Sequence, residues 1–594
     1  MSALISNALT LFACLGVELA ETARGHPIFF FSKWRTPWFS ESAVIIEPTF
    51  YNHLHRHSIF NTYSPSMSHL PPSTSSFRSA EQFSQGAVTS ESQQQMYVSL
   101  SSYIYQRVNK HGLRGGHNSP HTTSIHILDD DSLLNAFRLY RPFLLGEDQD
   151  VNIRFEGGVQ WVGERWWYRL AHVCQRWRNL IFGSASHLGL CLVCTYGTPV
   201  ADMLLYSPPL PLIIDYQHHN VTAEDEEAIM LALEQRDRVR RIRLVISVLK
   251  LRKLITAIDG EYPILEYLVF GDLPQDESMV LTLPETLQAP HLRHLAIACS
   301  IPIRFQLLAT AVGLVTLHLA LPNPSTYFQP TVLLQWLSLV PQLEMLLIFF
   351  YFPVSNRDVE RQLMRTPIMT HVTLPNLRVF AFQAVSAYSE AVLSRITAPR
   401  LEDFQICYFK QLTFSVPQLL QFMGRTENIR FDRAKFNFYS ERVYVVVYHA
   451  GTDSEMPVPA DAFSINVDCW HFDWQVSSVA QISNALSQMF STVEHLTLKH
   501  EEHSRSSEEH NEVDRVEWHK LLRSFSNVKT LHINDGLVRE LFHCLPLDGR
   551  EFPADLLPQL QELTHSGSGN ADDALTSFID ARQNAGRPVT LIKS

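Results

Sequence analysis

Apolar residues in the second half of the chain recur in one short motif. The motif is Pro, one residue, and then Leu-x-x-Leu-x-Leu or a close relative, as at Pro263 with Leu265, Leu268 and Phe270. Other copies begin at Pro290, Leu314, Pro341, Pro375, Pro399, Val493, Val528 and Pro558. Because alternate side chains of a strand point to the same face, each copy predicts a short strand with one buried apolar face.

The segments between the motif copies predict helices that cover these strands. TVLLQWLSLV at 331–340 and VPQLLQFMG at 416–424 are two such segments. Leu265 and Leu292, at equivalent positions, are 27 residues apart, within the leucine-rich-repeat range of roughly 20–29. We therefore predict an α/β fold over 261–594, an irregular leucine-rich-repeat solenoid with short parallel strands on its concave face and helices on its convex face. An ordinary parallel α/β domain is the alternative, and the lack of a glycine-rich phosphate loop after any strand favours the solenoid.

Residues 166–181, WWYRLAHVCQRWRNLI, have a strongly amphipathic pattern. The apolar positions recur every three or four residues, at Trp166, Leu170, Val173, Cys174, Trp177, Leu180 and Ile181. Arg169 and Arg176 are among the polar residues on the opposite face. This spacing predicts one continuous helix with a buried stripe, ended by Gly183. By itself the pattern fits packing inside any globular domain equally well.

A shorter helix is predicted upstream of this segment. Three consecutive acids, Asp129 to Asp131, precede the apolar residues Leu133, Leu134 and Phe137. Carboxylates in the first turn are favourable because they meet the positive end of the helix dipole. We therefore expect a helix to begin at the acids and to bury its apolar side chains.

Arginines are concentrated between residues 236 and 243. They follow a predicted helix in which Thr222 and Asp225 have the spacing of a capping box. Basic residues at a helix C-terminus meet the negative end of its dipole, so the run is explained without a ligand. The whole chain has a formal net charge of −12, and we predict no nucleic-acid partner.

Composition divides the chain into two very different parts. Its 594 residues are 45% hydrophobic and 18% charged, which is typical of globular proteins with room for several domains. Residues 1–122, by contrast, are rich in Ser, Pro and Gln, and we predict a largely disordered N-terminal region. No apolar run reaches the roughly 20 residues of a membrane span, so no membrane partner is expected.

The eight cysteines lie mostly inside apolar runs, as free thiols do in a reducing compartment, which predicts a cytoplasmic and/or nuclear location. Cys191 and Cys194 have the spacing of a zinc pair, but no second pair of ligands follows, so they are predicted to be strand core rather than a metal site. Sequence motifs for a hydrolase nucleophile, a P-loop, a dinucleotide site or a zinc protease are absent. We therefore predict that the protein is not an enzyme and uses no cofactor.

Residues 123–195 resemble an F-box-like domain of the divergent family abundant in mushroom-forming (basidiomycete) fungi. The resemblance lies in Ile127-Leu128, Ser132-Leu133-Leu134 and Val173-Cys174-x-x-Trp177-Arg178, followed by an irregular leucine-rich array. Leu128-Asp129 stands where the family has Leu-Pro, and residues 141–165 separate the two parts. The domains expected are a disordered region at 1–122, the F-box-like module at 123–195, a connecting strand and helix at 196–260, and the solenoid at 261–594.

The resemblance implies a substrate-recognition subunit of a cullin-RING ubiquitin ligase. The module would bind a Skp-type adaptor, the solenoid would bind an unknown protein substrate, and the transfer chemistry would belong to other subunits. The adaptor-binding residues that it implies are Leu128, Leu133, Leu134, Phe137, Val173, Cys174 and Trp177. Some of these must build the module's own core. A ligase-independent leucine-rich-repeat scaffold, in which the module caps the solenoid, is the alternative.

Overall fold

The computed structural model describes the chain from residue 129 to residue 593, with gaps. The described residues are 129–140, 166–217, 221–272, 281–302, 305–352, 369–411, 413–426, 431–449, 462–500, 515–534, 537–538, 541, 556–566 and 572–593. The chain divides into two compact units, Met1–Leu190 and Cys191–Ser594. The region predicted to be disordered, 1–122, and the predicted site residue Leu128 lie outside the described residues.

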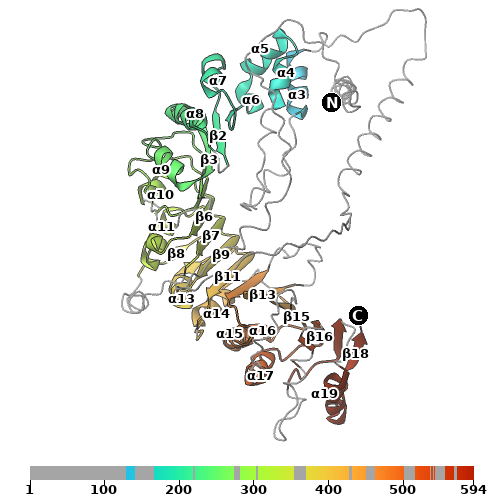
Figure 1. The fold of residues 1–594 in the computed structure, drawn as a ribbon. Coiled ribbons are helices and arrows are strands. Elements are labelled where there is room, and N and C mark those ends of the chain that lie inside the picture. The colour runs from blue at the N-terminus through green and yellow to red at the C-terminus, as the bar shows by residue number, and fades with distance from the viewer. Residues whose placement is uncertain are drawn as a thin grey trace, which may run out of the picture. The chain divides into compact units, whose positions relative to one another are not determined.

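The described part of the first unit is helical (Figure 1). Its helices are α3 (Asp130–Tyr140), α4 (Trp166–Ala171), α5 (Gln175–Gly183) and α6 (Ala185–Leu188). The helix predicted to begin at the acids is confirmed as α3, and the Asp129 side chain accepts a hydrogen bond of 2.7 Å from the Ser132 backbone N–H. That bond satisfies one of the N–H groups that a helix leaves unpaired in its first turn.

The prediction of one continuous helix over 166–181 is wrong. The helix is interrupted after Ala171, and a new helix begins at Gln175. Between them Cys174 has extended backbone angles, φ −158° and ψ 168°. Cys174 therefore precedes the second helix as its N-cap instead of continuing a buried stripe.

The second unit is a mixed α/β structure with one large sheet, most of whose neighbouring strands are parallel. Its sixteen strands lie in the order β1-β2-β3-β4-β5-β6-β7-β9-β11-β14-β13-β12-β15-β16-β17-β18. The strands before the middle are β1 (Leu192–Cys194), β2 (Leu212–Tyr216), β3 (Val239–Ile246), β4 (Tyr267–Asp272), β5 (His294–Ala298), β6 (Thr316–Leu321), β7 (Met345–Phe350), β9 (Val379–Ala384) and β11 (Asp403–Phe409). The others are β12 (Arg433–Phe438), β13 (Arg442–Tyr448), β14 (Phe463–Asp468), β15 (His495–His500), β16 (Thr530–Asn534), β17 (Glu562–Ser566) and β18 (Thr590–Lys593). The short strands β8 (Val372–Thr373) and β10 (Ile396–Thr397) form a separate pair.

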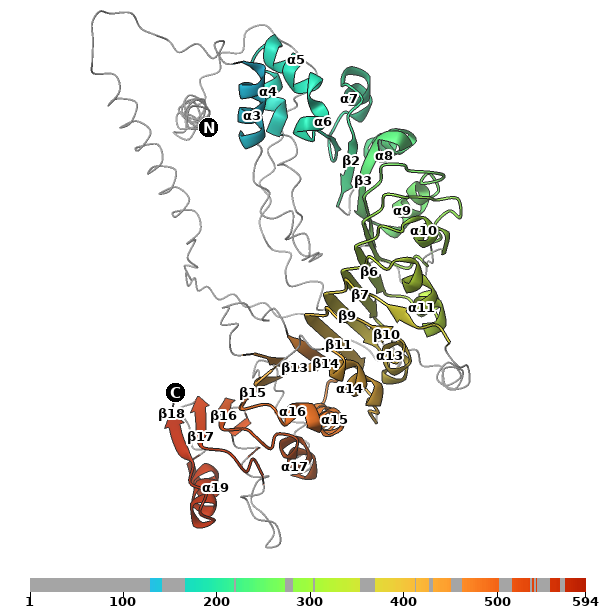
Figure 2. The same ribbon diagram turned by 180° about the vertical axis from the view of Figure 1, so that it is seen from behind.

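Helices connect most of these strands and lie along one face of the large sheet, as Figures 1 and 2 show. They are α7 (Val200–Tyr206), α8 (Ala223–Glu234), α9 (Val248–Ile255), α10 (Phe305–Thr310), α11 (Pro330–Leu339), α13 (Ser386–Leu393), α14 (Pro417–Gly424), α15 (Phe472–Ala485), α16 (Ser487–Phe490), α17 (Arg515–Arg523) and α19 (Asp572–Asn584). A series of right-handed crossovers that advances in one direction places every helix on the same side. We call the other face, on which no described helix lies, the open face.

The leucine motif correctly located nine strands of the large sheet. Each copy coincides with a strand, and its alternate apolar side chains are buried: Leu268 and Phe270 in β4 are 0% exposed, as is Leu295 in β5. The helices predicted at 331–340 and 416–424 are α11 and α14. Fully burying a leucine or phenylalanine contributes about 1.5–3 kcal/mol, so these faces hold neighbouring strands and helices together.

Two further local predictions are confirmed. Thr222 caps α8 in a capping box, because the Asp225 N–H donates to Thr222 Oγ1 at 3.1 Å and the Thr222 N–H donates to the Asp225 carboxylate at 3.0 Å. Cys191 and Cys194 are 2% and 0% exposed at strand β1, as predicted for strand core. Strand β1 pairs with β2 in the second unit, so that unit begins before residue 195.

The chain order and the sheet order differ at one place. Strand β12 pairs in parallel with β15, which comes later, while β13 runs antiparallel to β12. Strand β14 is antiparallel to β13 and parallel to β11. The stretch at 430–470 therefore inserts two antiparallel steps into an otherwise parallel sheet.

Candidate functional site

The helical module has its own aromatic core, made from residues on both sides of the gap at 141–165. The rings of Phe137 on α3 and Trp177 on α5 meet edge to face, with centroids 4.8 Å apart. Leu133, Phe137 and Trp177 are 0%, 1% and 2% exposed. These three predicted adaptor-binding residues therefore form the core, and a partner cannot contact their side chains unless the module opens.

A second aromatic contact joins α4 to α5. The rings of Trp167 and Phe182 lie edge to face with centroids 5.7 Å apart, and Trp166 and Leu170 on the same short helix are also buried. Aromatic pairs of this kind contribute about 0.5–1.5 kcal/mol beyond the area that they bury. The module is thus held together chiefly by aromatic packing between short helices.

The interruption between α4 and α5 is stabilised by a side chain. Arg178 Nε donates a hydrogen bond of 3.1 Å to the Ala171 carbonyl, one of the acceptors freed where α4 ends. The His172 and Val173 N–H groups bond to carbonyls three residues back, which tightens the last turn. As a result Val173 points outward and is 52% exposed.

The predicted site residues therefore divide into distinct groups. Val173 is exposed, while Leu134 and Cys174 are of intermediate burial, so these three are open to a partner. Val173 was predicted to lie on a buried stripe, and that prediction is wrong because the helix is interrupted next to it. The assignment of these residues to adaptor binding stays a prediction.

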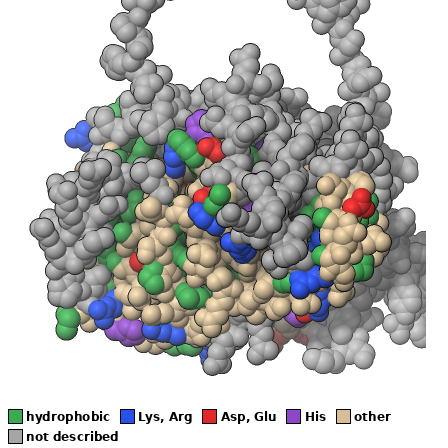
Figure 3. Space-filling model, turned by 90° about the horizontal axis from the view of Figure 1, so that it is seen from below, with side chains coloured by type: hydrophobic (Ala, Val, Ile, Leu, Met, Phe, Trp, Pro, Cys, Tyr) green, Lys and Arg blue, Asp and Glu red, His purple; other side chains and the backbone are tan. Residues whose placement is uncertain are grey.

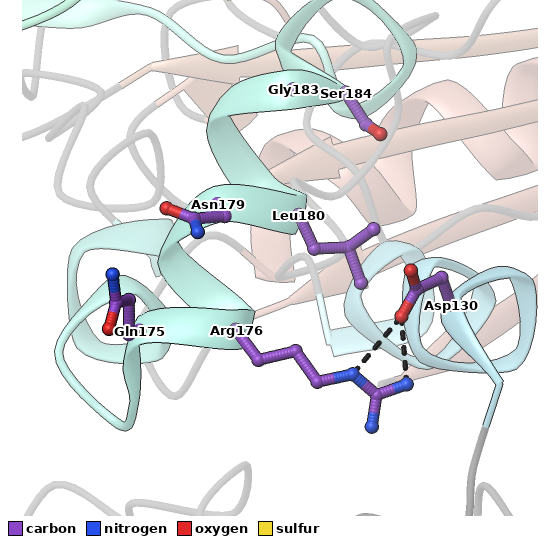
Figure 4. A pocket seen from close by; sticks show the side chains of 7 residues that line it. All are labelled: Asp130, Gln175, Arg176, Asn179, Leu180, Gly183 and Ser184. Carbon is purple, nitrogen blue, oxygen red and sulfur yellow. Dashed lines mark hydrogen bonds and ion pairs between the residues drawn. The ribbon is translucent and has the colours of Figure 1, made fainter.

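A shallow groove of about 580 Å³ lies between the start of α3 and one face of α5 (Figure 4). It is lined by Asp130, Gln175, Arg176, Asn179, Leu180, Gly183 and Ser184. Arg176 reaches across the groove and donates to Asp130 Oδ1 from Nη2 at 2.7 Å and from Nε at 3.1 Å. The Leu180 side chain stands beside this pair, so the groove combines one ion pair with one apolar side chain.

The sequence did not reveal the Asp130–Arg176 pair. The two residues lie on different helices, 46 positions apart, and no local signal tells which charges of two helices meet. The pair is partly exposed, and such surface pairs contribute about 0–1 kcal/mol.

The charged groups of the module lie at the start of α3 and in the groove. At the start of α3, hydrogen bonds from the backbone and side chain of Ser132 lower the pKa of Asp129, so this end of the helix carries negative charge. Among the described residues there is no group of three or more His, Cys, Asp and Glu side chains that could hold a metal ion. The groove itself contains one carboxylate, one guanidinium and neutral groups.

Comparison with models of known protein families gives no match, and comparison with curated proteins gives none. Within the part of the chain that the structure describes, no helix is both long and apolar enough to cross a membrane.

Proposed function

We propose that this protein is an F-box-type substrate-recognition subunit of a cullin-RING ubiquitin ligase. In this proposal the helical module binds a Skp-type adaptor, and the second unit, a leucine-rich-repeat solenoid, binds a protein substrate through the open face of its sheet. The protein brings the substrate close to the transfer machinery and carries out no chemistry itself.

The observation that carries the proposal is the exposed apolar residue at the interruption between two helices. Val173 belongs to the V-C-x-x-W-R sequence on which the resemblance to F-box-like domains rests, and it is 52% exposed. A valine held outward next to Cys174, which is of intermediate burial, is suited to packing against an apolar partner surface. Trp177 of the same V-C-x-x-W-R sequence is buried against Phe137, so this part of the module is packed.

One observation favours a ligase-independent scaffold as the second candidate. Leu133, Phe137 and Trp177 are buried in the module's core, so few large apolar side chains of the motif are accessible to an adaptor. In that case the module would serve only as a covering element, as the terminal units of repeat proteins require.

The test is a charge placed at the exposed valine. We expect Val173→Glu in the full chain to reduce capture by a purified Skp-type adaptor about tenfold or more, because binding would bury an unpaired carboxylate. Leu249→Glu is the matched control, since Leu249 on α9 is an apolar residue with 56% exposure. Circular dichroism checks that both variants are folded.

Two results would contradict this proposal. Equal capture of the Val173→Glu variant and the unsubstituted chain would show that this surface is not the adaptor interface. Failure of the unsubstituted chain to bind the adaptor, with a specific protein partner still retained, would select the scaffold. Substitution of Trp177 or Leu133 would be uninformative here, because loss of the core would abolish binding for either function.

A further inference from the structure

Exposed aromatic side chains gather at one edge of the large sheet. Six aromatic residues are among the large apolar side chains that stay exposed in the described part of the chain, and four of them follow β7 or β14. Tyr351 and Phe352 come directly after β7, whereas Trp470 and Trp474 come after β14, just before α15 and in its first turn. We call these four residues the aromatic rim.

The order of the strands brings the members of the aromatic rim to the same edge. Strands β7, β9, β11 and β14 are neighbours in that order, and each neighbouring pair is parallel. The carboxyl ends of parallel strands lie at one edge of a sheet, so the residues after β7 and β14 lie three strand spacings apart, roughly 14 Å. An extended peptide of about five residues spans that distance.

One ring of the aromatic rim already holds a cation from its own chain. Lys410 follows β11, and its Nζ lies over the Trp474 ring, 2.6 Å from the ring centroid. The His471 ring contacts the same indole edge to face, with centroids 4.7 Å apart. The face of an indole ring is negative and attracts cations, so the Lys410 contact indicates the kind of group that this surface favours.

The other tryptophan of the aromatic rim is open to a ligand. Trp470 is 60% exposed, and within the described ranges its indole has neither a cation over its face nor a contact with another ring. A ligand can therefore stack on Trp470 without displacing Lys410 from Trp474.

Carboxylates lie close to the exposed indole. Burial is the largest cause that raises the pKa of the Cys469 thiol, next to Trp470 in the chain. The positive charge of Lys410 lowers that pKa, and the charges of Asp473 and Asp468 raise it. One cation and two carboxylates are therefore near enough to act on this residue.

The two carboxylates differ in their own partners. Burial raises the pKa of Asp468 most, Arg442 lowers it, and Glu441 raises it; Arg442 is also paired with Asp468 by register between β13 and β14. Asp468 Oδ2 accepts a further hydrogen bond of 3.3 Å from Gln383 Nε2. Asp473, by contrast, forms no ion pair with any residue that the structure describes. The cluster thus has three carboxylates and two cations, and Asp473 is the carboxylate that is left for a ligand.

We propose that the aromatic rim binds a basic, extended segment of a partner protein, with one arginine stacked on Trp470. A planar guanidinium can lie flat on an indole and donate to a carboxylate at the same time, and Asp473 is three positions from Trp470, at the start of α15. Tyr351 and Phe352 offer ring surface to residues further along the same segment. The inference goes beyond the proposed function, because it does not depend on adaptor binding.

A purely apolar partner fits the aromatic rim less well. Figure 3 shows one face of the molecule, on which hydrophobic side chains of the described residues lie singly or in small groups among neutral ones. Where exposed apolar groups are small, an interface depends on a few ring contacts rather than on apolar area. An apolar partner would also leave the carboxylate of Asp473 buried and unpaired, which costs free energy, whereas an arginine would pair with it.

Fluorescence anisotropy of a labelled peptide with the full chain at physiological salt tests this inference. The probe repeats Gly-Arg-Ser, and the comparison peptide has citrulline, which is neutral and of similar shape, in place of each Arg. We expect the arginine peptide to bind about tenfold or more tightly than the citrulline peptide. Trp470→Leu, which removes the ring but no charge, should abolish most of that difference.

Matched controls separate the aromatic rim from general attraction to a chain with a net charge of −12. Phe305→Leu removes an exposed ring at the start of α10 and should leave binding unchanged. Asp473→Asn should weaken binding of the arginine peptide severalfold. Asp237→Asn, at an exposed acid elsewhere in the second unit, should not.

Three results would overturn the inference. They are equal binding of the two peptides, unchanged binding of the arginine peptide by the Trp470→Leu chain when circular dichroism shows it folded, and an equal loss of binding in the Phe305→Leu chain. Adaptor capture is measured separately on the same preparation. A chain that captures the adaptor but binds both peptides equally rejects this inference alone, and the reverse result rejects the adaptor proposal alone.

Discussion

The hydrophobic cores of the two units are built differently. The helical module relies on a few large aromatic side chains, with Phe137 against Trp177 and Trp167 against Phe182. The second unit repeats a small contribution many times, because each strand buries two or three apolar side chains against the next, as Leu268 and Phe270 do. The first arrangement concentrates stability in single residues, whereas the second distributes it.

The largest expected effect compares one tryptophan from each unit. Trp177→Ala should cost about 3–5 kcal/mol and remove most of the module's packing, since Trp177 is 2% exposed and contacts Phe137. Hydrogen–deuterium exchange should then show loss of protection throughout 166–183 and no change at β4 to β7.

The matched control for that substitution is Trp518→Ala in the second unit. Trp518 on α17 is 0% exposed and lies 6.0 Å from Phe438 and 6.2 Å from Phe472, between ring centroids. We expect a similar local cost, confined to α15, α17 and the strands beside them. If the two substitutions removed exchange protection over equally large parts of their units, the contrast between a concentrated and a distributed core would be wrong.

A buried arginine near the end of the sheet should give the next largest effect. Arg582 on α19 is 0% exposed, and its guanidinium donates to the carbonyls of Leu556, Leu557 and Leu560 at 2.9, 3.3 and 3.5 Å. Arg582→Met should cost about 3 kcal/mol because it leaves buried acceptors unpaired.

If many strands each contribute a small part of the second unit's stability, Arg582→Met should reduce exchange protection only near the substituted residue. Exchange should rise at β17 and β18 and remain unchanged at β4 to β7. Arg587→Met, at an exposed position three residues beyond the end of α19, is the control and should have little effect. A single cooperative loss over the whole second unit would contradict the distributed description.

Acid should weaken the second unit through a buried histidine. His318 on β6 is 5% exposed, its ring lies 5.7 Å from that of Phe349, and burial lowers its pKa from 6.5 to about 4. The folded state then binds fewer protons than the unfolded state between these values, so stability falls as the pH falls from 6.5 towards 4. The full loss is about 3.5 kcal/mol, because each tenfold change in proton affinity between pKa 6.5 and about 4 is worth about 1.4 kcal/mol.

Urea unfolding of the second unit between pH 7 and pH 4 measures this effect. His318→Gln should flatten the pH dependence, since it removes the group that must be protonated. His291→Gln, at an exposed position, is the control and should leave the pH dependence as it was. An unchanged slope in the His318→Gln variant would show that other groups cause the acid sensitivity.

The smallest expected effect is at the first capped helix of the second unit. Thr222→Ala removes the side chain that accepts from the Asp225 N–H at 3.1 Å, and loss of such a cap costs about 1 kcal/mol. Chemical denaturation should detect this loss, and exchange should rise at the start of α8. Thr256→Ala, at an exposed hydroxyl after α9, should cost less.

Local features of the fold could be predicted from the sequence because they depend on neighbouring residues. The spacing of Leu268 and Phe270 defines a strand, and Thr222 with Asp225 defines a helix start. The order of β12, β13 and β14 could not be predicted in this way. Their alternating residues identify each as a strand, but partner choice depends on residues far away in the chain.

The candidate site was predicted less well than the strands. The pattern placed Leu133, Phe137 and Trp177 among the apolar positions of the module. It did not tell which apolar positions lie in the core, as these three do, and which lie at the surface. It also continued the helix through Val173, and it gave no sign of the bond from Arg178 Nε to the Ala171 carbonyl that spans the interruption. That bond joins residues seven positions apart and has no counterpart in helical periodicity.

The reversal in the middle of the sheet has a consequence for how the protein is made. Strands β1 to β11 find their partners in the order in which a ribosome produces them, but β11 pairs with β14, and Phe409 is 54 residues before Phe463. At about 5–20 residues per second this separation corresponds to about 3–10 s of synthesis. During that interval the edge of β11 is a template that wrong strands can join, and β12 is the first strand available to it. The middle of the sheet is therefore where newly made chains are most exposed to mispairing, and where a bound chaperone would protect them most.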